Sequence, residues 1–319
     1  MITKKQTNLN QRKLKRTIFV ATLMLWPVAH YLVFWLYVNL QTVVLSFQRF
    51  NVYTGKFEWY GLNNYIMQWQ DVYLGKNTQM HNALLNSFNV WGINAIILPL
   101  AVIASYTFHK KIPCEKFFRV IFYLPHMISV TTLTLCYRYL FENNAYTFIG
   151  PLAGMFNTFG LSLDWWNVVD PSKVIWPLIY GYHIWFGLGA NVILISGAMN
   201  RIPREVTEAA KLDGIGFWQE LFCITIPMVM PTIGTFLLTS LTGVMSYGMI
   251  PMLLIGPTTN GGSNGQAYTM GWYMFNVAKA GDAQLAAATA IGIIFSVFMF
   301  PVVILARKLI NKLTPDVEY

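Results

Sequence analysis

Long apolar runs alternate with short polar segments along the whole chain of 319 residues. A helix needs about 20 mostly apolar residues to cross the hydrocarbon core of a membrane, and six runs are long enough. The first run has enough length to be tilted or to include an interfacial turn. The pattern predicts an all-α integral membrane fold, with one six-span domain over 18–306 between polar termini at 1–17 and 307–319. The predicted spans are 18–47, 83–108, 118–141, 174–199, 224–246 and 283–306.

The composition agrees with a membrane protein. Hydrophobic residues make up 55% of the chain and charged residues 11%, whereas an ordinary soluble domain carries about 25% charged residues. The basic N-terminus and the apolar run after it mimic a signal peptide, but the run is too long and no A-x-A-like site follows, so we expect an uncleaved first span. Cys114, Cys136 and Cys223 lack metal or redox spacing and are interpreted as small apolar side chains.

The distribution of positive charge predicts how the spans are oriented. The net charge of +9 is concentrated at the ends of the apolar runs, which is typical of membrane orientation and not of nucleic-acid binding. If the N-terminus is cytoplasmic, most of the 22 basic residues lie on the cytoplasmic side. Both termini are therefore expected to be cytoplasmic.

A polar segment, 200–223, separates the fourth and fifth predicted spans. Pro203 suits the first position of a helix, and Glu205 complements the positive end of the helix dipole. Asp213 and Gly214 should end this helix, because glycine readily adopts the left-handed conformation of a helix stop. We expect a short cytoplasmic helix here. By itself the pattern is equally typical of a solvated connector and of a helix that docks on a cytoplasmic partner.

The two sides of this segment differ in polarity. Arg204, Glu208 and Lys211 project to one side of the short helix. After the glycine, the apolar residues of 217–222 share one helical face, with Glu220 off that face. The second piece is therefore expected to lie along the membrane interface and to lead into the fifth span.

One motif in the segment resembles a family signature. The pattern Glu208-Ala209-Ala210, three residues, Gly214, nine residues and Ile224-x-Ile226-Pro227 resembles the cytoplasmic signature of permease subunits of binding-protein-dependent ABC importers. The likeness runs nearly end to end and is strongest to the carbohydrate branch, the maltose-type and sugar-phosphate-type permeases. The stretches that carry it are "WYGLNNY" at 59–65, "FYLPHMIS" at 122–129, "IPREVTEAAKLDG" at 202–214 and "ITIPMVMP" at 224–231.

The resemblance implies the type I importer fold and a division of labour. In this family two homologous six-span permease subunits pair, and an extracytoplasmic solute-binding protein delivers the sugar. Each permease inserts its Glu-Ala-Ala helix into one of two copies of a cytoplasmic ABC ATPase, and ATP binding switches the spans from inward- to outward-facing. The expected function is that of the transmembrane subunit of an ATP-driven importer of a saccharide in the bacterial plasma membrane, surrounded by lipids and without a nucleic-acid partner.

The resemblance also implies which residues couple ATP hydrolysis to transport. Glu208 would contact the ATPase, and Gly214 would fix the angle of the helix. The chain contains no G-x-x-x-x-G-K-[ST] motif, so ATP and Mg are expected on the partner ATPase subunits. We expect this chain to be no enzyme and to hold neither a cofactor nor a metal. The implied coupling residues are Pro203, Glu208, Ala209, Ala210, Asp213 and Gly214.

The resemblance places a saccharide path in the spans on either side of the coupling loop. Aromatic and polar side chains occur there together, and this mixture suits sugars because aromatic rings stack on sugar C–H faces while polar groups bond hydroxyls. Each of these residues has a simpler alternative role, such as packing or a hydrogen bond within the helix bundle. The candidate residues are His183, Trp185, Gly187, Asn191, Ser240 and Tyr247.

Other functions fit the sequence less well. An ion-coupled secondary transporter usually needs a carboxylate inside its spans, and the predicted spans contain none. An intramembrane enzyme would need a nucleophile with a base, or a metal set, and no such spacing occurs in a span. Among importers, a polyol, glycerol-phosphate or amino-acid cargo remains an alternative. A phosphorylated cargo would favour basic residues in the two candidate spans, which carry none, so a neutral oligosaccharide is preferred.

Overall fold

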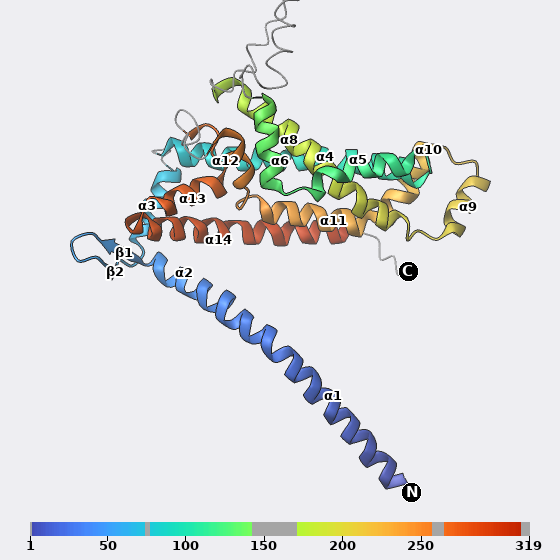
Figure 1. The fold of residues 1–319 in the computed structure, drawn as a ribbon, viewed down its shortest axis with the longest axis horizontal. Coiled ribbons are helices and arrows are strands. Elements are labelled where there is room, and N and C mark those ends of the chain that lie inside the picture. The colour runs from blue at the N-terminus through green and yellow to red at the C-terminus, as the bar shows by residue number, and fades with distance from the viewer. Residues whose placement is uncertain (1, 74–76, 142–170, 257–264, 314–319) are drawn as a thin grey trace, which may run out of the picture. The chain divides into compact units, whose positions relative to one another are not determined.

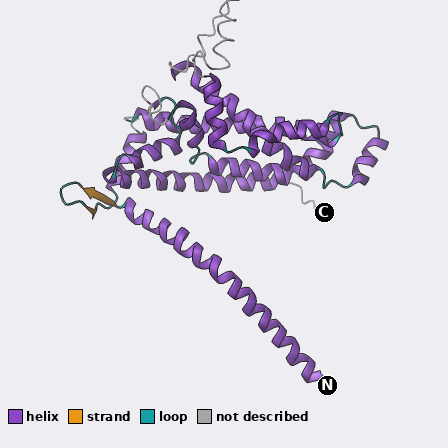
Figure 2. Ribbon diagram, viewed as in Figure 1, coloured by secondary structure: helices purple, strands orange, loops and turns teal. Residues whose placement is uncertain are grey.

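The computed structural model describes residues 2–73, 77–141, 171–256 and 265–313. It divides into two compact units that are described separately: Met1–Gln68 with Ala278–Ile293, and Trp69–Val277 with Ile294–Tyr319. Helices dominate the described residues, and Figure 2 shows a small two-stranded hairpin among them. The predicted helical membrane class is confirmed, with the hairpin as an addition that the hydrophobic pattern did not predict.

The first unit begins with one long helical run. Residues Lys15–Ser46 of this run are long and apolar enough to cross a membrane, and none of the residues in its most apolar window is buried. The run contains the predicted first span, and helix continues through the basic segment before it. Its parts are α1 (Ile2–His30), the π-helical η1 (Tyr31–Tyr37) and α2 (Val38–Ser46), and α3 (Asn63–Tyr73) leads on into the second unit.

A β-hairpin follows the first span. Strand β1 (Gln48–Asn51) pairs antiparallel with β2 (Lys56–Trp59). In the turn, the side-chain oxygen of Asn51 accepts a hydrogen bond from the backbone N–H of Tyr53 at 2.9 Å, and Gly55 adopts a left-handed φ of +65°. Asparagine and glycine favour turns for these two reasons. The sequence analysis did not predict this hairpin, because its strands are only four residues long and do not alternate clearly between apolar and polar residues.

The second unit contains most of the predicted spans. Helix α4 carries the second predicted span and α8 the fourth, while the fifth and sixth lie in α10–α11 and α14 (Figure 1). The helix α14 begins in the first unit and continues into the second. The elements are α4 (Thr78–His109), α5 (Glu115–Met127), α6 (Val130–Phe141), α8 (Pro171–Met199), α9 (Arg204–Leu212), α10 (Phe217–Glu220), the π-helical η3 (Leu221–Thr225), α11 (Ile226–Gly243), α12 (Met249–Ile255), α13 (Met270–Lys279) and α14 (Asp282–Leu313).

The third predicted span, 118–141, is wrong as a single helix. The structure forms α5 and α6 instead, and the two are bent by 98° at the break between them. The turn has a local cause, because Pro125 lies in the last turn of α5 and Ile128 is extended, with φ −86° and ψ 147°. The described residues hold five helices that can cross a membrane, and a sixth if the bent pair counts as one span. Hydropathy counts apolar residues and does not detect such a corner.

The core of the second unit lies between α4, α8 and the continuous helix formed by α10, η3 and α11. Helix α8 also approaches α5 closely at Gly189, where an added Cβ would overlap the carbonyl oxygen of Phe122. Ser105 on α4 donates a buried hydrogen bond to the carbonyl oxygen of Val192 on α8 at 2.9 Å. These contacts join the helices that carry the polar sites described below. The buried cluster contains Ala101, Val102, Tyr106, Phe108, Val192, Ile195, Met199, Ile202, Leu221, Val229 and Ile233.

Candidate coupling site and membrane pocket

Helix α9 has a defined start and stop. The sequence analysis placed Pro203 at the first helical position. In the structure Pro203 is the N-cap, with φ −59° and ψ 137°, and the helix begins one residue later at Arg204. At the other end the N–H of Gly214 bonds to the carbonyl of Lys211, and the N–H of Ile215 bonds to the carbonyl of Ala210. This pair of bonds is a Schellman motif, which requires a left-handed residue. Gly214 supplies it with a φ of +69°.

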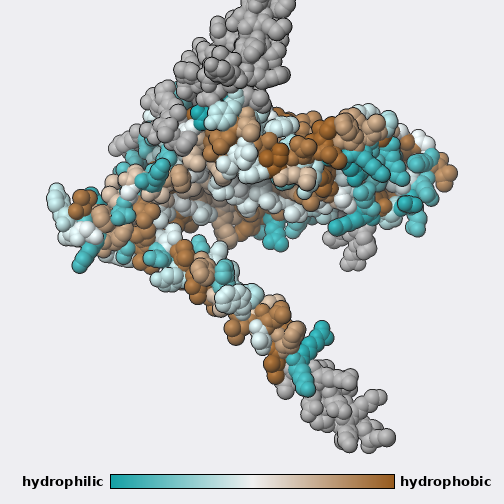
Figure 3. Space-filling view, viewed as in Figure 1, coloured by the Kyte–Doolittle hydropathy of each residue, from teal (hydrophilic) through white to brown (hydrophobic). Residues whose placement is uncertain are grey.

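The outer surface of α9 is charged and unpaired. In the described part of the chain, Arg204, Glu208 and Lys211 are exposed and form no ion pair. The last residue of the helix, Leu212, is 89% exposed. Figure 3 shows hydrophilic side chains gathered where α9 and the neighbouring helix ends lie in Figure 1. A helix with free charges and a free apolar side chain offers a surface for a protein partner.

The inner surface of α9 faces the bundle. Ala210 is 3% exposed, and Val206 is partly buried and packs against the core cluster. Ala209, by contrast, is exposed, as are Pro203, Asp213 and Gly214. Of the six candidate coupling residues, the structure thus points one alanine inward and leaves the other five accessible. The small size of Ala210 lets the helix lie close to the bundle.

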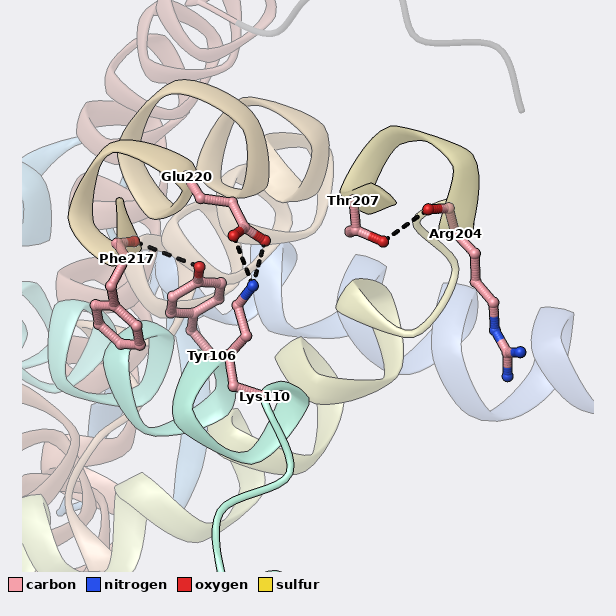
Figure 4. Close-up of polar contacts among 6 residues, drawn as sticks. All are labelled: Tyr106, Lys110, Arg204, Thr207, Phe217 and Glu220. Carbon is pink, nitrogen blue, oxygen red and sulfur yellow. Dashed lines mark hydrogen bonds and ion pairs between the residues drawn. The ribbon is translucent and has the colours of Figure 1, made fainter. Parts of the chain in front are cut away.

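A polar cluster fixes α10 to the C-terminal end of α4, as Figure 4 shows. The Lys110 ammonium lies 2.5 Å and 2.6 Å from the two carboxylate oxygens of Glu220, and Glu220 is only 4% exposed. The hydroxyl of Tyr106 donates to the backbone carbonyl of Phe217 at 3.3 Å. The Lys110 ammonium also lies 5.3 Å from the centre of the Tyr106 ring.

The burial of Glu220 corrects an expectation from the helical pattern. The pattern placed Glu220 off the apolar face, whereas the structure buries it, and it leaves Phe217 and Trp218 partly exposed. Lys110 and Glu220 were both missed as site residues. A signal was present, because Glu220 is the one acidic residue between Gly214 and Pro227, and a carboxylate among apolar residues needs a cationic partner.

A polar pocket lies between α4, α8 and α11. Its volume is about 200 Å³. Asn191 and Ser240, both predicted, are part of its wall, and each also bonds within its own helix, Asn191 to the carbonyl of Gly187 and Ser240 to that of Leu237. No charged side chain belongs to the wall as far as the described residues show it. The wall consists of Asn94, Leu98, Asn191, Phe236, Leu237, Thr239 and Ser240.

Three other predicted path residues, His183, Trp185 and Tyr247, are not part of the pocket wall. His183 connects Tyr247 to the pocket residue Asn94, with ring nitrogens 3.2 Å from the Tyr247 hydroxyl and 3.3 Å from the Asn94 side-chain oxygen. Trp185 is 44% exposed and stacks against Tyr137, so it lies outside the pocket wall.

Two further outcomes complete the placement of these residues. Gly187 faces the side chain of Ile97 and supplies the carbonyl that holds Asn191. Asn94 was missed by the sequence reasoning, because α4 carries four asparagines, Asn82, Asn86, Asn89 and Asn94, and their type alone does not single one out. Among the described residues, no group of three or more His, Cys, Asp and Glu side chains is arranged to hold a metal ion.

Comparison with known proteins decides the family. The profile of the family described as binding-protein-dependent transport system inner membrane component matches residues 97–315. The chain belongs to this family. The matched region includes α9, the Lys110–Glu220 cluster and every wall residue of the pocket except Asn94.

Relatives of this permease come from several bacteria. It is 25% identical to the multiple sugar-binding transport system permease MsmF of Streptococcus mutans, over 94% of this chain and 98% of that protein. It is 24% identical to the diacetylchitobiose uptake system permease NgcF of Streptomyces coelicolor, over 93% and 83% of the two chains. A chain in the crystal structure of a bacterial ABC transporter for alginate import shares the fold, with a TM-score of 0.77, 22% identity and coverage of 94% and 98%.

The geometry of the permease separates two kinds of polar site. The charged groups lie at the ends of the helices, where Lys110, Glu220 and the α9 residues are found, whereas the polar groups in the pocket wall are amides and hydroxyls. Charged groups suit contact with a protein or a firm link between helices. Neutral amides and hydroxyls suit a ligand that is itself neutral and rich in hydroxyls.

Proposed function

We propose that this permease is the transmembrane subunit of an ATP-driven importer, and that α9 docks on a cytoplasmic ATPase. The observation that supports the docking is the surface of α9, which exposes Glu208, Lys211 and Leu212 without an internal partner. The Schellman motif at Gly214 holds the helix at a fixed angle, so a push on α9 is not absorbed by a loose loop. This chain performs no hydrolysis, and ATP and Mg bind to the partner subunits.

We infer that the cargo is a neutral saccharide. The relatives named above are permeases for multiple sugars and for diacetylchitobiose, and a third, MalC of Streptococcus pneumoniae, is a maltodextrin permease. The pocket agrees with this cargo, because its polar residues are Asn94, Asn191, Thr239 and Ser240. Amide and hydroxyl groups can exchange hydrogen bonds with sugar hydroxyls and impose no charge requirement.

The complete importer requires further subunits. One solved alginate transporter was crystallised in complex with a pentasaccharide-bound periplasmic protein, which supports an extracytoplasmic solute-binding protein for this permease as well. We propose in addition a second, homologous permease subunit and two copies of the ATPase. In this assembly the permease crosses the plasma membrane with both termini in the cytoplasm, consistent with the concentration of basic residues at the α9 end.

The docking proposal is tested by a pull-down of the cognate ATPase on the tagged permease complex in detergent. Glu208→Ala should weaken the capture of the ATPase by about tenfold or more, because a hydrogen bond to a charged group contributes about 1.5–3 kcal/mol. Glu115→Ala is the matched control, since it removes an acidic residue from α5 that pairs within its own helix. Equal capture by the wild type and Glu208→Ala would contradict this role of Glu208.

The cargo proposal is tested on the cognate solute-binding protein by titration calorimetry. The panel contains neutral mono- and oligosaccharides, an acidic oligosaccharide, a polyol, glycerol phosphate and amino acids. We expect tight binding of a neutral oligosaccharide. Binding of glycerol phosphate or an amino acid alone would overturn the cargo and leave the family assignment intact.

A further inference from the structure

The cytoplasmic end of α4 contacts both ends of the coupling loop 200–223. On the entering side, His109 Nδ1 lies 3.3 Å from the side-chain oxygen of Asn200, directly after α8. On the leaving side, Tyr106 and Lys110 hold Phe217 and Glu220. One helical turn of α4 therefore closes the base of the loop from which α9 projects.

The contact on the leaving side is much the stronger of the two. Both carboxylate oxygens of Glu220 lie within 2.6 Å of the Lys110 ammonium, and Glu220 is buried while Lys110 remains 27% exposed at its side chain. The Tyr106 ring packs against Phe217, with ring centres 4.8 Å apart. A buried carboxylate separates from its cation only at a large cost, so α4 and α10 are held together wherever this pair is intact.

The two helices joined by this pair also form the wall of the pocket. Helix α10 continues without a break through η3 into α11, which contributes Thr239 and Ser240 to the wall. Helix α4 contributes Asn94, about 24 Å from Lys110 along the helix at about 1.5 Å per residue. Movement of α9 thus reaches two sides of the pocket through one junction.

We propose that Lys110 and Glu220 are a positioning pair that makes α4 move together with α10 and α11 when the coupling helix is displaced. The inference rests on the proposed function, because it needs α9 to be the element that the ATPase moves. The pair touches neither ATP nor the cargo. Its role is to make the helices of the pocket wall move together with the coupling loop, so that each ATP hydrolysed results in transport of cargo.

The test is the ratio of cargo imported to ATP hydrolysed, measured on the complete importer in proteoliposomes with its solute-binding protein. The variants are Lys110→Gln, Glu220→Gln, the double variant and Lys110→Arg. Each Gln variant should lower the ratio by about 2- to 30-fold, the range expected for residues that carry coupling between sites. The double variant should fall no lower than the singles, and Lys110→Arg should stay close to the wild type because it keeps the charge.

The matched control is Glu115→Gln, which breaks the ion pair with Arg119 inside α5. This variant removes a carboxylate from an ion pair that lies within one helix and does not join two helices. Its ratio of cargo imported to ATP hydrolysed should therefore equal that of the wild type. A ratio that the Lys110 and Glu220 variants leave unchanged would overturn the inference. So would singles whose effects multiply in the double variant, because the two residues would then act independently.

A covalent link between the two positions gives a second test that does not depend on the ion pair. Lys110→Cys with Glu220→Cys, in a chain whose three native cysteines are replaced, should couple poorly and recover when a short bifunctional reagent joins the two positions. Loss of transport on cross-linking would show that α4 and α10 must separate, which overturns the inference. A wild-type complex that assembles but imports no saccharide would instead contradict the proposed function.

Discussion

Two short polar helices, α9 and α10, flank Gly214 and differ in where their charges go. Helix α9 exposes Glu208 and Lys211 to solvent without a partner in the described structure. Helix α10 buries Glu220 and pairs it with Lys110 of a helix far away in sequence. The difference shows that the two helices have different structural roles. Helix α9 presents unpaired charges on its surface, which we call the free surface, and α10 is fixed to α4 by the Lys110–Glu220 pair, which we call the anchor.

The comparison also bears on the proposal that the loop transmits force from an ATPase. The charged groups on the surface of α9 have no partner within the chain and can bind one from another subunit. The carboxylate of Glu220 holds α10 in place because it is buried and already paired with Lys110. Gly214 lies between the two and sets the angle of one to the other. Substitutions on either side, or at the glycine, should therefore affect different properties.

The largest expected effect comes from breaking the anchor. Lys110→Met leaves the buried Glu220 carboxylate without its cationic partner and should lower the free energy of unfolding by about 3 kcal/mol, the lower end of the usual range because Lys110 is partly exposed. Thermal unfolding of the purified permease complex in detergent measures this. The double variant Lys110→Met/Glu220→Leu should recover most of the loss, and a double variant as unstable as the single would contradict the assignment.

A smaller effect is expected at the junction between the two helices. Gly214→Ala forces a side chain into a left-handed conformation and should cost about 1–2 kcal/mol locally, although no atom lies within 4 Å of the added Cβ. Capture of the ATPase should fall, while the melting temperature should change little because the helix end can fray. Gly214→Asn is the control, since asparagine tolerates this conformation. Equal loss in both variants would point to contact and not conformation.

The smallest effect on folding is expected on the free surface. Leu212→Ser should change the free energy of unfolding by less than about 0.5 kcal/mol, because the side chain is exposed and packs against nothing in the described structure. Capture of the ATPase should nevertheless weaken, by about 1.5 kcal/mol or more if the leucine becomes buried on docking. Exposed Phe222 on η3, replaced by serine, serves as the control. If Leu212→Ser lowered the stability of the permease but left the capture of the ATPase unchanged, Leu212 would be a packing residue and not part of a docking surface.

Several features followed from the sequence because their causes are local. The start of α9 near Pro203 and its end at Gly214 depend on backbone conformations that individual residues favour, and the structure differs by one position at the start. The spans followed from runs of apolar residues, which must leave water whatever their neighbours are. Asn191 and Ser240 were chosen as path residues by resemblance, and the structure places both at one pocket.

The features that the sequence missed depend on contacts across the fold. The 98° corner between α5 and α6 interrupts an apolar run that hydropathy treats as continuous. The amide of Asn94 could be assigned to the pocket only once α4, α8 and α11 were placed together. The two alanines of the motif, Ala209 and Ala210, are equivalent in composition, and only packing decides that Ala210 faces the bundle.

The sequence by itself determined the membrane class, the approximate position of most spans, the family and the ends of α9. Each of these depends on hydrophobicity, charge or backbone preference, which residues carry with them in any fold. The tertiary structure alone decided that Glu220 is an anchor and Glu208 a free charge, because both are glutamates in one polar segment and differ only in what lies next to them. The partner of Glu220 is Lys110, and only the folded chain brings the two within 2.6 Å.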